Sequence, residues 1–537
     1  MRNITAAREL SNITRTAFGP NGRNKLVLNH LEKLFLTSDA ATIIREAEIV
    51  HPAAKLLVQA STQQETEQGD ATNLVIIFGG ELLAKAEWLL NIGVHPSDVV
   101  KGYEMAWEKA RHILESLCID SAQVANPKDK NQLENVIRTT LYAKQPDFVD
   151  HLTMLCLDAA EVIMPKHPAN FNVDSVRVVK IMGGSPWDSR VVHGMVFGRE
   201  PEGTVRHVSH AKVAVFTCPV DISQTETKGT VLIKSAEQML DFSKGEERQM
   251  EQVVQELANA GVNVVVSGSG IGELALHYLN RYGMMVVKVL SKFDLRRLCR
   301  VIGATALARL GAPTPEEMGL CSRVETVEIG SDWVTVFRQE SGEVTRTATI
   351  VLRGATQNLL DDMERAIDDA VNMVKASCKD GRVVAGAGAC ELDVAQRLQQ
   401  WSSKVAGVQQ LAARAYAEAF ECIPNALAVN AGLDGTEVIS NLYTAHQQYA
   451  KEHKDVPCPF GVHADSEDGN IESSEQLKGV KDVVKSGIVE PMVVKENAIR
   501  LATDAALTIL RVDQIIMSKP AGGPKPPKKN GGNWDED

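Results

Sequence analysis

The spacing of apolar residues predicts helices in the two terminal parts of the chain. Apolar positions recur three and four residues apart over residues 41–64 and 74–90, with interruptions at Gly and Pro residues. The same pattern returns at 358–377 and again from Val408 onwards. Residues at this spacing lie on one face of a helix, which can be buried against a partner. We therefore expect residues 1–115 and the C-terminal part to be mainly helical.

The middle of the chain has a different pattern. Between about Ser175 and Gly354, short runs rich in β-branched residues predict strands. These runs are VRVVKI (176–181), KVAVF (212–216), VNVVVSG (262–268), MMVVKVL (284–290), WVTVF (333–337) and TATIVLRG (347–354). Helical patterns at 246–260 and 271–282 lie between several of them. Strands that alternate with helices indicate an α/β domain.

The order helical, α/β, helical predicts an inserted domain whose two flanks fold together as one helical base. A site built from both flanks would join residues that lie hundreds of positions apart. Residues 451–474 are rich in Gly, Pro, Asp and Glu, which predicts an exposed loop. The tail from Lys519 onwards has almost no apolar content, which predicts disorder.

Length and net charge limit the number of domains and the kinds of partner that this protein can have. A chain of 537 residues exceeds what one hydrophobic core usually supports, so about three domains are expected. The net charge of −12 argues against nucleic acid or a membrane surface as a partner, because both are anionic. No apolar stretch reaches about 18 residues, and the N-terminus lacks the apolar core of a secretory signal. We therefore expect a cytoplasmic protein.

The nine cysteines are scattered along the chain, and no two of them form a CxxC pair. Neither a disulfide framework nor a zinc site is indicated by this spacing. We expect reduced thiols that are mostly buried.

A glycine-rich turn near the N-terminus is the first candidate for nucleotide binding. It contains Phe18, Gly19 and Pro20. Glycine lets backbone N–H groups approach a phosphate, and Pro20 offers a rigid face to a base or ribose. An ordinary turn is the alternative, because Gly-Pro and Asn-Gly pairs mark turns in many proteins.

The second candidate is the segment from Gly69 to Asn73, directly before the apolar helical pattern at 74–90. The N-terminus of a helix has free N–H groups that bind anions, and Asp70 could hold Mg²⁺ that bridges phosphates. The alternative is a simple helix cap, since Asp and Thr are favoured there.

Asp369 is the third candidate. The apolar stripe of its predicted helix includes Met363, Ile367 and Val374, and Asp369 lies on the opposite, polar side. A solvated surface aspartate is one interpretation. The other is a carboxylate that orients or deprotonates a water molecule in phosphoryl transfer.

The fourth candidate is the small-residue turn at 383–389, which contains Gly386 and could pack against a nucleotide. A loop before a helix is the equal alternative. The sequence has no P-loop, no strand followed by GxGxxG, no HExxH and no GxSxG, so the common nucleotide-binding folds and hydrolase classes are not indicated.

In this order and around an α/β insertion, the four segments resemble the group II chaperonins. The family pattern is a Gly-Pro turn, an Asn-Asp-Gly turn, Gly-Asp-Gly-Thr, a distal Asp-Ala on a helix and a triple glycine, and this chain meets it with substitutions. Longer runs extend the resemblance over essentially the whole chain and point to one subunit type of the eukaryotic cytosolic chaperonin. These runs are NHLEKLF (29–35), TETKGTVLIK (225–234), DLRRLC (294–299), GATAL (303–307) and DQIIMSKPAGGPKPP (513–527).

The resemblance implies an ATP site with ATP or ADP and Mg²⁺ as cofactors. Asp70 would bind the metal, and Asp369 would position the attacking water, with Asp39 near the γ-phosphate as a second carboxylate. Lys144 would sense the γ-phosphate near a hinge. The other residues that the resemblance assigns to the nucleotide are Phe18, Gly19, Pro20, Ala71, Thr72, Asn73, Leu74, Ala143, Gly386, Ala387, Glu490 and Lys495.

The resemblance also implies a fold with three domains. A mainly α-helical equatorial domain would comprise residues 1–115, extending to about 138, and 395–518. A small α/β intermediate domain would comprise 139–203 and 354–394, and an α/β apical domain 204–353, with a helical protrusion near 242–250. Residues 519–537 would form the disordered tail.

By the same resemblance, the chain would be a protein-folding subunit of a hetero-oligomeric double ring with a built-in lid. Its partners would be paralogous subunits and unfolded client polypeptides, including cytosolic proteins such as actin and tubulin. ATP hydrolysis would drive the domain movements. The chain would begin inside the usual N-terminal segment of the family and lack a strand that links neighbouring subunits.

Ala40, Ala71 and Ala387 stand where the family pattern has glycine. A methyl group near phosphate, or a positive φ that alanine resists, would weaken nucleotide binding. A second hypothesis is therefore a subunit that retains nucleotide with little turnover and has a structural and client-binding role. A third, a monomeric small-molecule kinase, lacks a discernible site for a phosphate acceptor. The three retained aspartates, Asp39, Asp70 and Asp369, favour the ATP-hydrolysing chaperonin subunit.

Overall fold

The computed structural model describes residues 1–221, 236–330, 332–339, 347–453, 456–464 and 478–516. The expected tail at 519–537 and residues 454–455 and 465–474 of the expected loop lie outside these ranges.

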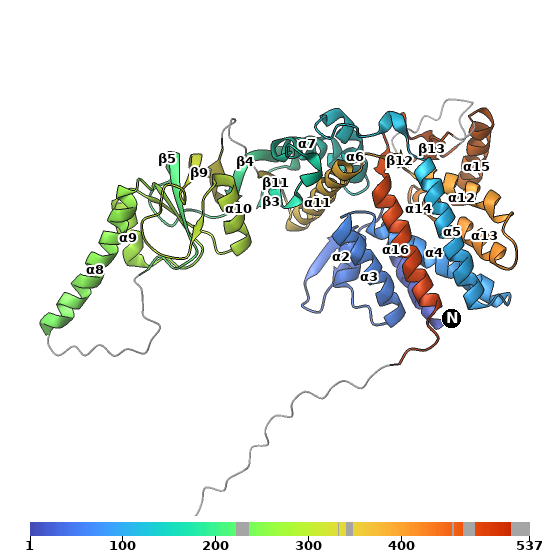
Figure 1. Cartoon of the computed structure of the whole chain (residues 1–537), viewed down its shortest axis with the longest axis horizontal. Coiled ribbons are helices and arrows are strands. Elements are labelled where there is room, and N and C mark those ends of the chain that lie inside the picture. Colours follow the sequence, from blue (N-terminus) through green and yellow to red (C-terminus); the bar gives the residue numbers. More distant parts are fainter. Residues whose placement is uncertain (222–235, 331, 340–346, 454–455, 465–477, 517–537) are drawn as a thin grey trace, which may run out of the picture.

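Helices from both ends of the chain form one bundle (Figure 1). Its apolar core joins residues between Ile4 and Leu117 with residues between Val384 and Leu510, so the two terminal parts fold together as predicted. The helices are α1 (Arg2–Arg15), α2 (Ala40–Glu46), α3 (Pro52–Glu67), α4 (Thr72–Asn91), α5 (Pro96–Ser116), α12 (Ala389–Ser402), α13 (Gln409–Ala419), α14 (Cys422–Asn430), α15 (Gly435–Glu452) and α16 (Met492–Leu510).

The N-terminal part is not helical throughout. β1 (Lys25–Leu28) and β2 (Leu34–Thr37) form an antiparallel hairpin, in which Leu26 lies opposite Leu36. The helical pattern at 41–64 also proves to be two helices. Proline inside a helix removes a hydrogen bond and clashes with the preceding turn, but it is tolerated at a helix start. Pro52 therefore begins α3, and the His51 side chain accepts a hydrogen bond from the backbone N–H of Ala53.

A second apolar core lies between the bundle and the sheet. It contains side chains of α6 (Lys130–Tyr142), α7 (Val149–Ile163) and α11 (Gln357–Lys379), packed against β3 (Val176–Met182) and β11 (Ala348–Gly354). Short 3₁₀ helices connect this region: η1 (Asp120–Ala122), η2 (Pro146–Phe148), η3 (Pro168–Asn170), η4 (Val173–Ser175) and η5 (Pro186–Asp188).

The described residues of the middle region form a nine-stranded mixed sheet with the order β3-β11-β4-β10-β9-β5-β6-β7, and β8 pairs with β5. The six predicted runs correspond to β3, β5, β6, β7, β10 and β11. β4 and β9 were not predicted, because polar and glycine residues interrupt their apolar positions. The further strands are β4 (Arg190–Phe197), β5 (His207–Phe216), β6 (Val264–Ser267), β7 (Met285–Lys288), β8 (Ala306–Leu307), β9 (Gly319–Ile329) and β10 (Asp332–Arg338).

Helices cover both faces of the part of the sheet around β5, β6 and β7. Val215 and Val266 point to the side of α10 (Lys292–Ile302). Phe216 and Val265 point to the side of α8 (Ala236–Asn259) and α9 (Glu273–Arg281). Successive residues of a strand face opposite sides, which explains why residues 213–216 of β5, 264–266 of β6 and 285–287 of β7 are apolar without interruption. The α/β character predicted for this region is confirmed.

Two short ribbons join segments of the C-terminal part. β12 (Val383–Ala385) pairs with β15 (Val489–Pro491), and β13 (Phe460–Val462) pairs with β14 (Val480–Asp482). The expectation of an exposed loop at 451–474 is therefore wrong for 460–462, because Val462 packs among Leu392 and Leu427.

All nine cysteines are free thiols, and five of them are buried. In the part of the chain that the structure describes, no helix is long and apolar enough to cross a membrane.

Candidate functional site

A pocket with a volume of about 190 Å³ lies where the helical bundle meets the second core. Its walls come from both flanks of the inserted region, as the split layout predicts. The predicted site residues that line it are Phe18, Gly19, Pro20, Asp39, Asp70, Ala71, Thr72, Asn73, Leu74, Ala143, Lys144, Ala387, Glu490 and Lys495.

The turn around Gly19 forms one edge of the pocket and is held by C-terminal residues. Gly19 has φ +81°, and a Cβ atom there would lie 2.5 Å from a side-chain carbon of Leu427. The side-chain amide of Asn430 donates hydrogen bonds to the carbonyl oxygens of Arg15 and Phe18, at 3.0 and 2.8 Å. Position 19 therefore requires glycine, because of both its positive φ and the small space left for a Cβ atom. The turn is fixed by Asn430, which lies more than 400 positions away along the chain.

The N-terminus of α4 opens into the same pocket. Thr72, Asn73 and Leu74 occupy its first turn, where backbone N–H groups have no partner within the helix. Gln64 of α3 donates to the carbonyl oxygen of Asp70 at 2.9 Å, which holds the turn in place. The free N–H groups and the helix dipole make this end of the pocket favourable for an anion such as phosphate.

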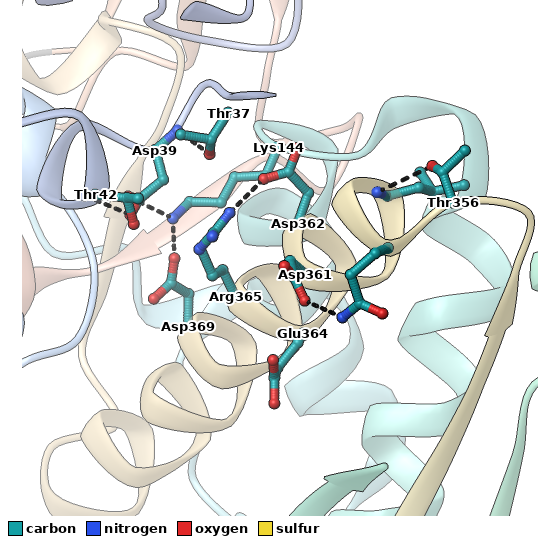
Figure 2. A network of polar contacts seen from close by, with 12 residues as sticks. Thr37, Asp39, Thr42, Lys144, Thr356, Asp361, Asp362, Glu364, Arg365 and Asp369 are labelled. Carbon is teal, nitrogen blue, oxygen red and sulfur yellow. Dashed lines mark hydrogen bonds and ion pairs between the residues drawn. The ribbon is translucent and has the colours of Figure 1, made fainter. Parts of the chain in front are cut away.

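A buried lysine links two carboxylates beside this turn. Figure 2 shows the Lys144 ammonium between Asp39 and Asp369. Its Nζ lies 3.4 Å from Asp39 Oδ1 and also bonds Asp369 Oδ2. Their side chains are 13 to 18% exposed, so the charges interact strongly.

The charges in this cluster shift one another's pKa values. Burial alone lowers the pKa of Lys144, but the carboxylates of Asp39 and Asp70 raise it above its ordinary value. Burial raises the pKa of Asp39, but Lys144 and hydrogen bonds from Thr42 outweigh burial and hold that pKa below its usual range. Asp39 caps α2 by accepting from the backbone N–H and hydroxyl of Thr42, at 3.0 and 2.8 Å. The pair is therefore ionised near neutral pH.

Two predicted residues do not line this pocket. Asp369 reaches it only through Lys144, and it lines a neighbouring pocket together with Gly69 and Asn372. Gly386 lies behind the wall, where its backbone N–H donates to the carbonyl oxygen of Ile488 at 3.1 Å. A Cβ atom at Gly386 would lie 3.0 Å from Glu490 Oε1, so this glycine leaves space for that carboxylate.

Another part of the pocket lining holds an ion-pair cluster around a buried lysine. Lys495 Nζ lies 2.9 Å from Glu391 Oε1 and 3.0 Å from Glu490 Oε2. Burial alone lowers the pKa of Lys495, but the two carboxylates raise it above its ordinary value. Burial raises the pKa of Glu490 against the opposing effect of Lys495.

Two of the three alanines that replace glycine have a left-handed backbone. Ala71 has φ +63° and Ala387 has φ +50°. The left-handed conformation is therefore adopted at these positions, contrary to the expectation that alanine denies it. Ala40 differs, because it is the first residue of α2.

Several lining residues were not predicted from the sequence. They are Ala17, Ser38, Ala40, Thr139, Thr140, Tyr142, Met373, Gly388, Glu391, Ile423, Leu427, Val462, Ala464, Lys481, Ile488, Pro491 and Val494. Glu391 follows the Gly386 turn closely, which was the one sequence signal that could have drawn attention to it. Some of the others, such as Ser38, Tyr142 and Gly388, are direct neighbours of predicted site residues, and most of the rest come from segments without a recognisable motif.

The carboxylates suit a metal that is bound together with phosphate. Among the described residues, no cluster of three or more His, Cys, Asp or Glu side chains forms a protein-only metal site. Asp70 lies at the phosphate-favouring end of the pocket. Mg²⁺ usually takes one or two protein carboxylates and completes its shell with substrate phosphates and water, so Asp70 fits this role.

Comparison with known proteins gives a consistent result. The TCP-1/cpn60 chaperonin family profile matches residues 10–520. The chain is 54% identical over 538 residues to the probable T-complex protein 1 subunit theta of Schizosaccharomyces pombe, covering 100% of this chain and 95% of that protein.

The T-complex protein 1 subunits theta of Saccharomyces cerevisiae and Homo sapiens are each 49% identical, over 549 and 538 residues. Both alignments cover 100% of this chain, with 95% and 94% of the relatives. Theta is the subunit type to which the long sequence runs pointed, and the resemblance is confirmed. The chain belongs to the TCP-1/cpn60 chaperonin family.

Proposed function

We propose that this chain is an ATP-hydrolysing subunit of a protein-folding chaperonin. The observation that carries the proposal is the meeting, in one pocket, of the α4 N-terminus, the Asp39–Lys144 pair and Glu490, with Asp369 bonded to Lys144 from behind the pocket wall. Phosphoryl transfer needs positioning, charge stabilisation and an oriented water more than covalent catalysis.

In this proposal the triphosphate lies against α4, and the base and ribose lie toward β15. Phe18, Gly19 and Pro20 flank the nucleotide, and Thr72, Asn73 and Leu74 present N–H groups to phosphate. Mg²⁺, held by Asp70, would supply positive charge to the phosphates. Asp369 orients the attacking water and accepts its proton, and Asp39 lies near the γ-phosphate as a second carboxylate.

Lys144 has a distinct role in this scheme. In the structure its ammonium bonds Asp39 and Asp369. A γ-phosphate would compete with them for the ammonium, which would free Asp369 for water. Lys144 would thus couple phosphate binding to the helix α11 that carries Asp369.

The division of the apolar residues into separate clusters supports a proposed division into three domains. We assign the helical bundle to an equatorial domain, the second core to an intermediate domain and the α/β region to an apical domain that binds unfolded clients. The relatives' names contain the word subunit, which supports assembly with paralogous subunits. A hetero-oligomeric double ring in the cytoplasm, with clients such as actin and tubulin, is part of this proposal.

The second candidate function is retention of nucleotide with little turnover. The observation in its favour is that Ala71 and Ala387 place methyl groups at the pocket wall, where the family pattern has glycine. In this case the subunit would serve mainly as a structural and client-binding wall.

Asp369→Asn tests the proposed hydrolysis. We expect nucleotide binding to persist and hydrolysis on this chain to fall at least about 100-fold, as for loss of a group that acts on the attacking water. The measurement is the ratio of ATP to ADP bound to this chain after a single turnover with radiolabelled ATP. The matched control is Asp368→Asn, which removes the same charge from the next residue of α11.

Two outcomes would count against the proposal. Unchanged hydrolysis in Asp369→Asn would show that this carboxylate does not act on the attacking water. A wild-type chain that binds ATP but leaves it intact, or that holds ADP without exchange, would favour the second candidate function.

A further inference from the structure

Two buried side chains of α3 hold the turn that contains Asp70. Gln64 Nε2 donates a hydrogen bond to the carbonyl oxygen of Asp70 at 2.9 Å, and Ser61 Oγ donates one to the carbonyl oxygen of Thr72 at 3.2 Å. Both Ser61 and Gln64 are 0% exposed. The two hydrogen bonds therefore hold the backbone on both sides of Ala71.

Ala71, between these two bonds, has a left-handed backbone with φ +63° and ψ +22°. Alanine avoids this conformation because its Cβ atom approaches the following carbonyl oxygen. The φ angle of Ala71 is set by the plane of the peptide group that joins it to Asp70, and Gln64 holds the carbonyl oxygen of that group. A change of Ala71 to a negative φ would turn this peptide group and break the bond from Gln64. An unfavourable backbone conformation persists only where its surroundings impose it.

Gln64 is itself fixed by α16. Its Nε2 also donates to the carbonyl oxygen of Val494 at 3.2 Å, and its Oε1 accepts a hydrogen bond from Asn497 Nδ2 at 2.9 Å. Both donor positions of the amide are thus in use, and so is its oxygen. A flipped amide would place that oxygen against two carbonyl oxygens. The side chain therefore has a single orientation.

The stability of the bundle alone does not explain this arrangement. The net contribution of a buried hydrogen bond to stability is modest, because the same groups bond to water in the unfolded chain. A buried polar network whose groups are all paired instead specifies one geometry. Here the network joins two residues that line the nucleotide pocket, Asp70 and Val494, through one side chain of α3.

We propose that Gln64, supported by Ser61, is a positioning residue that keeps Ala71 left-handed and so holds Asp70 in the orientation that binds Mg²⁺. The inference rests on the proposed ATP site, in which Asp70 is the metal ligand, and adds what fixes that ligand. Glycine adopts a left-handed backbone without the penalty that alanine has. Because this chain has alanine where the family pattern has glycine, its metal site depends on the hydrogen bonds from α3.

The test measures how strongly Mg²⁺ improves nucleotide binding, and it requires no hydrolysis. The full-length chain, in the complex with which it is purified, is photolabelled with a trace of radioactive 8-azido-ADP. Unlabelled ADP competes for the site in EDTA or at increasing concentrations of free Mg²⁺. The label on this chain then gives two quantities: the ADP affinity without metal, and the Mg²⁺ midpoint, which is the concentration that produces half of the metal-dependent gain in affinity.

Gln64→Met keeps the approximate length of the side chain and removes both donors. The Mg²⁺ midpoint should rise about tenfold or more, as for loss of a group that orients a metal ligand, while the ADP affinity in EDTA changes less than about twofold. Adding Ala71→Gly to this variant should return the Mg²⁺ midpoint close to the wild-type value, because glycine adopts the turn without Gln64. A purely structural role for Gln64 predicts no such rescue, since the lost hydrogen bonds are not replaced.

Thr503→Val is the matched control. It removes from α16 a hydroxyl that is 0% exposed and bonds Tyr416, and neither residue lines the nucleotide pocket. This variant should lower the midpoint of thermal unfolding and leave the Mg²⁺ midpoint unchanged. Ser61→Ala provides a second route if Gln64→Met does not fold, because it removes only the hydroxyl that bonds Thr72. It should also raise the Mg²⁺ midpoint.

Three results with Gln64→Met would overturn the inference: an unchanged Mg²⁺ midpoint, equal losses of ADP affinity with and without the metal, or no rescue by Ala71→Gly. If that variant does not fold, an unchanged Mg²⁺ midpoint in Ser61→Ala would overturn it. A wild-type chain that ADP does not protect from labelling, or whose ADP affinity does not respond to Mg²⁺, would instead refute the proposed ATP site itself.

Discussion

Two alanines at the wall of the pocket hold a backbone conformation that glycine adopts more easily. Ala71 and Ala387 have φ values of +63° and +50°. In this region the Cβ atom approaches the following carbonyl oxygen, which costs about 1–2 kcal/mol per residue. Ala40, the third alanine at a family glycine position, begins a helix, where alanine is favoured. The three substitutions are therefore unequal in their effect on stability.

Replacing Ala71 with glycine should stabilise the chain by up to about 1 kcal/mol, because the left-handed backbone is relaxed. The measurement is the midpoint of thermal unfolding without nucleotide. Ala40→Gly is the matched control and should destabilise by about 1 kcal/mol, since glycine is unfavourable within a helix. Equal effects at the two positions would show that backbone strain at Ala71 is not significant.

His446 makes stability depend on pH. Its side chain is buried, with Nε2 2.8 Å from the carbonyl oxygen of Phe460, and burial lowers its pKa although this contact and Asp393 oppose the shift. The unfolded chain takes up a proton below about pH 6.5, whereas the folded chain takes it up only at lower pH. Stability should thus decrease as the pH falls below about 6.5.

The variant His446→Gln retains a side-chain N–H donor and cannot titrate. Its thermal midpoint should depend less on pH between about 7.5 and 5.5 than that of the wild type. Identical pH dependence in both proteins would mean that other groups account for the acid sensitivity.

Single residues of the site could be predicted from the sequence only where a motif marks them. Asp39, Asp70 and Asp369 lie in such motifs, and all three are brought to one region. Glu391 was missed because its neighbours do not distinguish a buried pocket carboxylate from an ordinary acidic residue in the first turn of a helix. Its partner Lys495 comes from a distant segment, and only the fold shows that they meet.

At the scale of elements, the short ribbons shape the pocket although they contain only three residues per strand. Strands this short have no recognisable periodicity, so the sequence could not predict them. The longer strands β6 and β11 and residues 213–216 of β5 were predicted because both faces are buried there and the strands contain continuous apolar runs.

Gly461 of β13 supports the turn that contains Ala387. A Cβ atom at Gly461 would lie 2.9 Å from the carbonyl oxygen of Ala387 and 2.9 Å from a side-chain carbon of Val483. Gly461→Ala should therefore displace this wall and weaken nucleotide binding about tenfold or more, measured by competition for a photoactive ATP analogue. Gly198→Ala, where nothing lies within 4 Å of the added carbon, is the control and should bind normally.

At the scale of the whole molecule, ion pairs join α10 to the region of β3. Arg177 bonds Asp294, and Arg297 lies 3.4 Å from Asp294 and 3.8 Å from Asp174. These side chains belong to segments more than 100 residues apart, so their pairing could not be predicted from the sequence.

Asp294→Asn should loosen α10 from β3, because it leaves Arg177 and Arg297 with fewer carboxylate partners. The expected loss of local stability is about 1 kcal/mol, since these groups are partly buried. Hydrogen exchange of backbone amides in α10 and β3 is the measurement, and exchange there should accelerate severalfold. Asp332→Asn, at an exposed position, is the control.

The joining of distant segments in one core also has a consequence for synthesis on the ribosome. Helix α4 is buried partly by α16, although about 400 residues separate them along the chain. At about 5–20 residues per second, the apolar face of α4 emerges on the order of 20 to 80 s before its C-terminal partner exists. The nascent chain therefore passes through a long interval in which its own N-terminal helices must be shielded from aggregation. The nucleotide pocket is completed only after β15 and α16 have been synthesised.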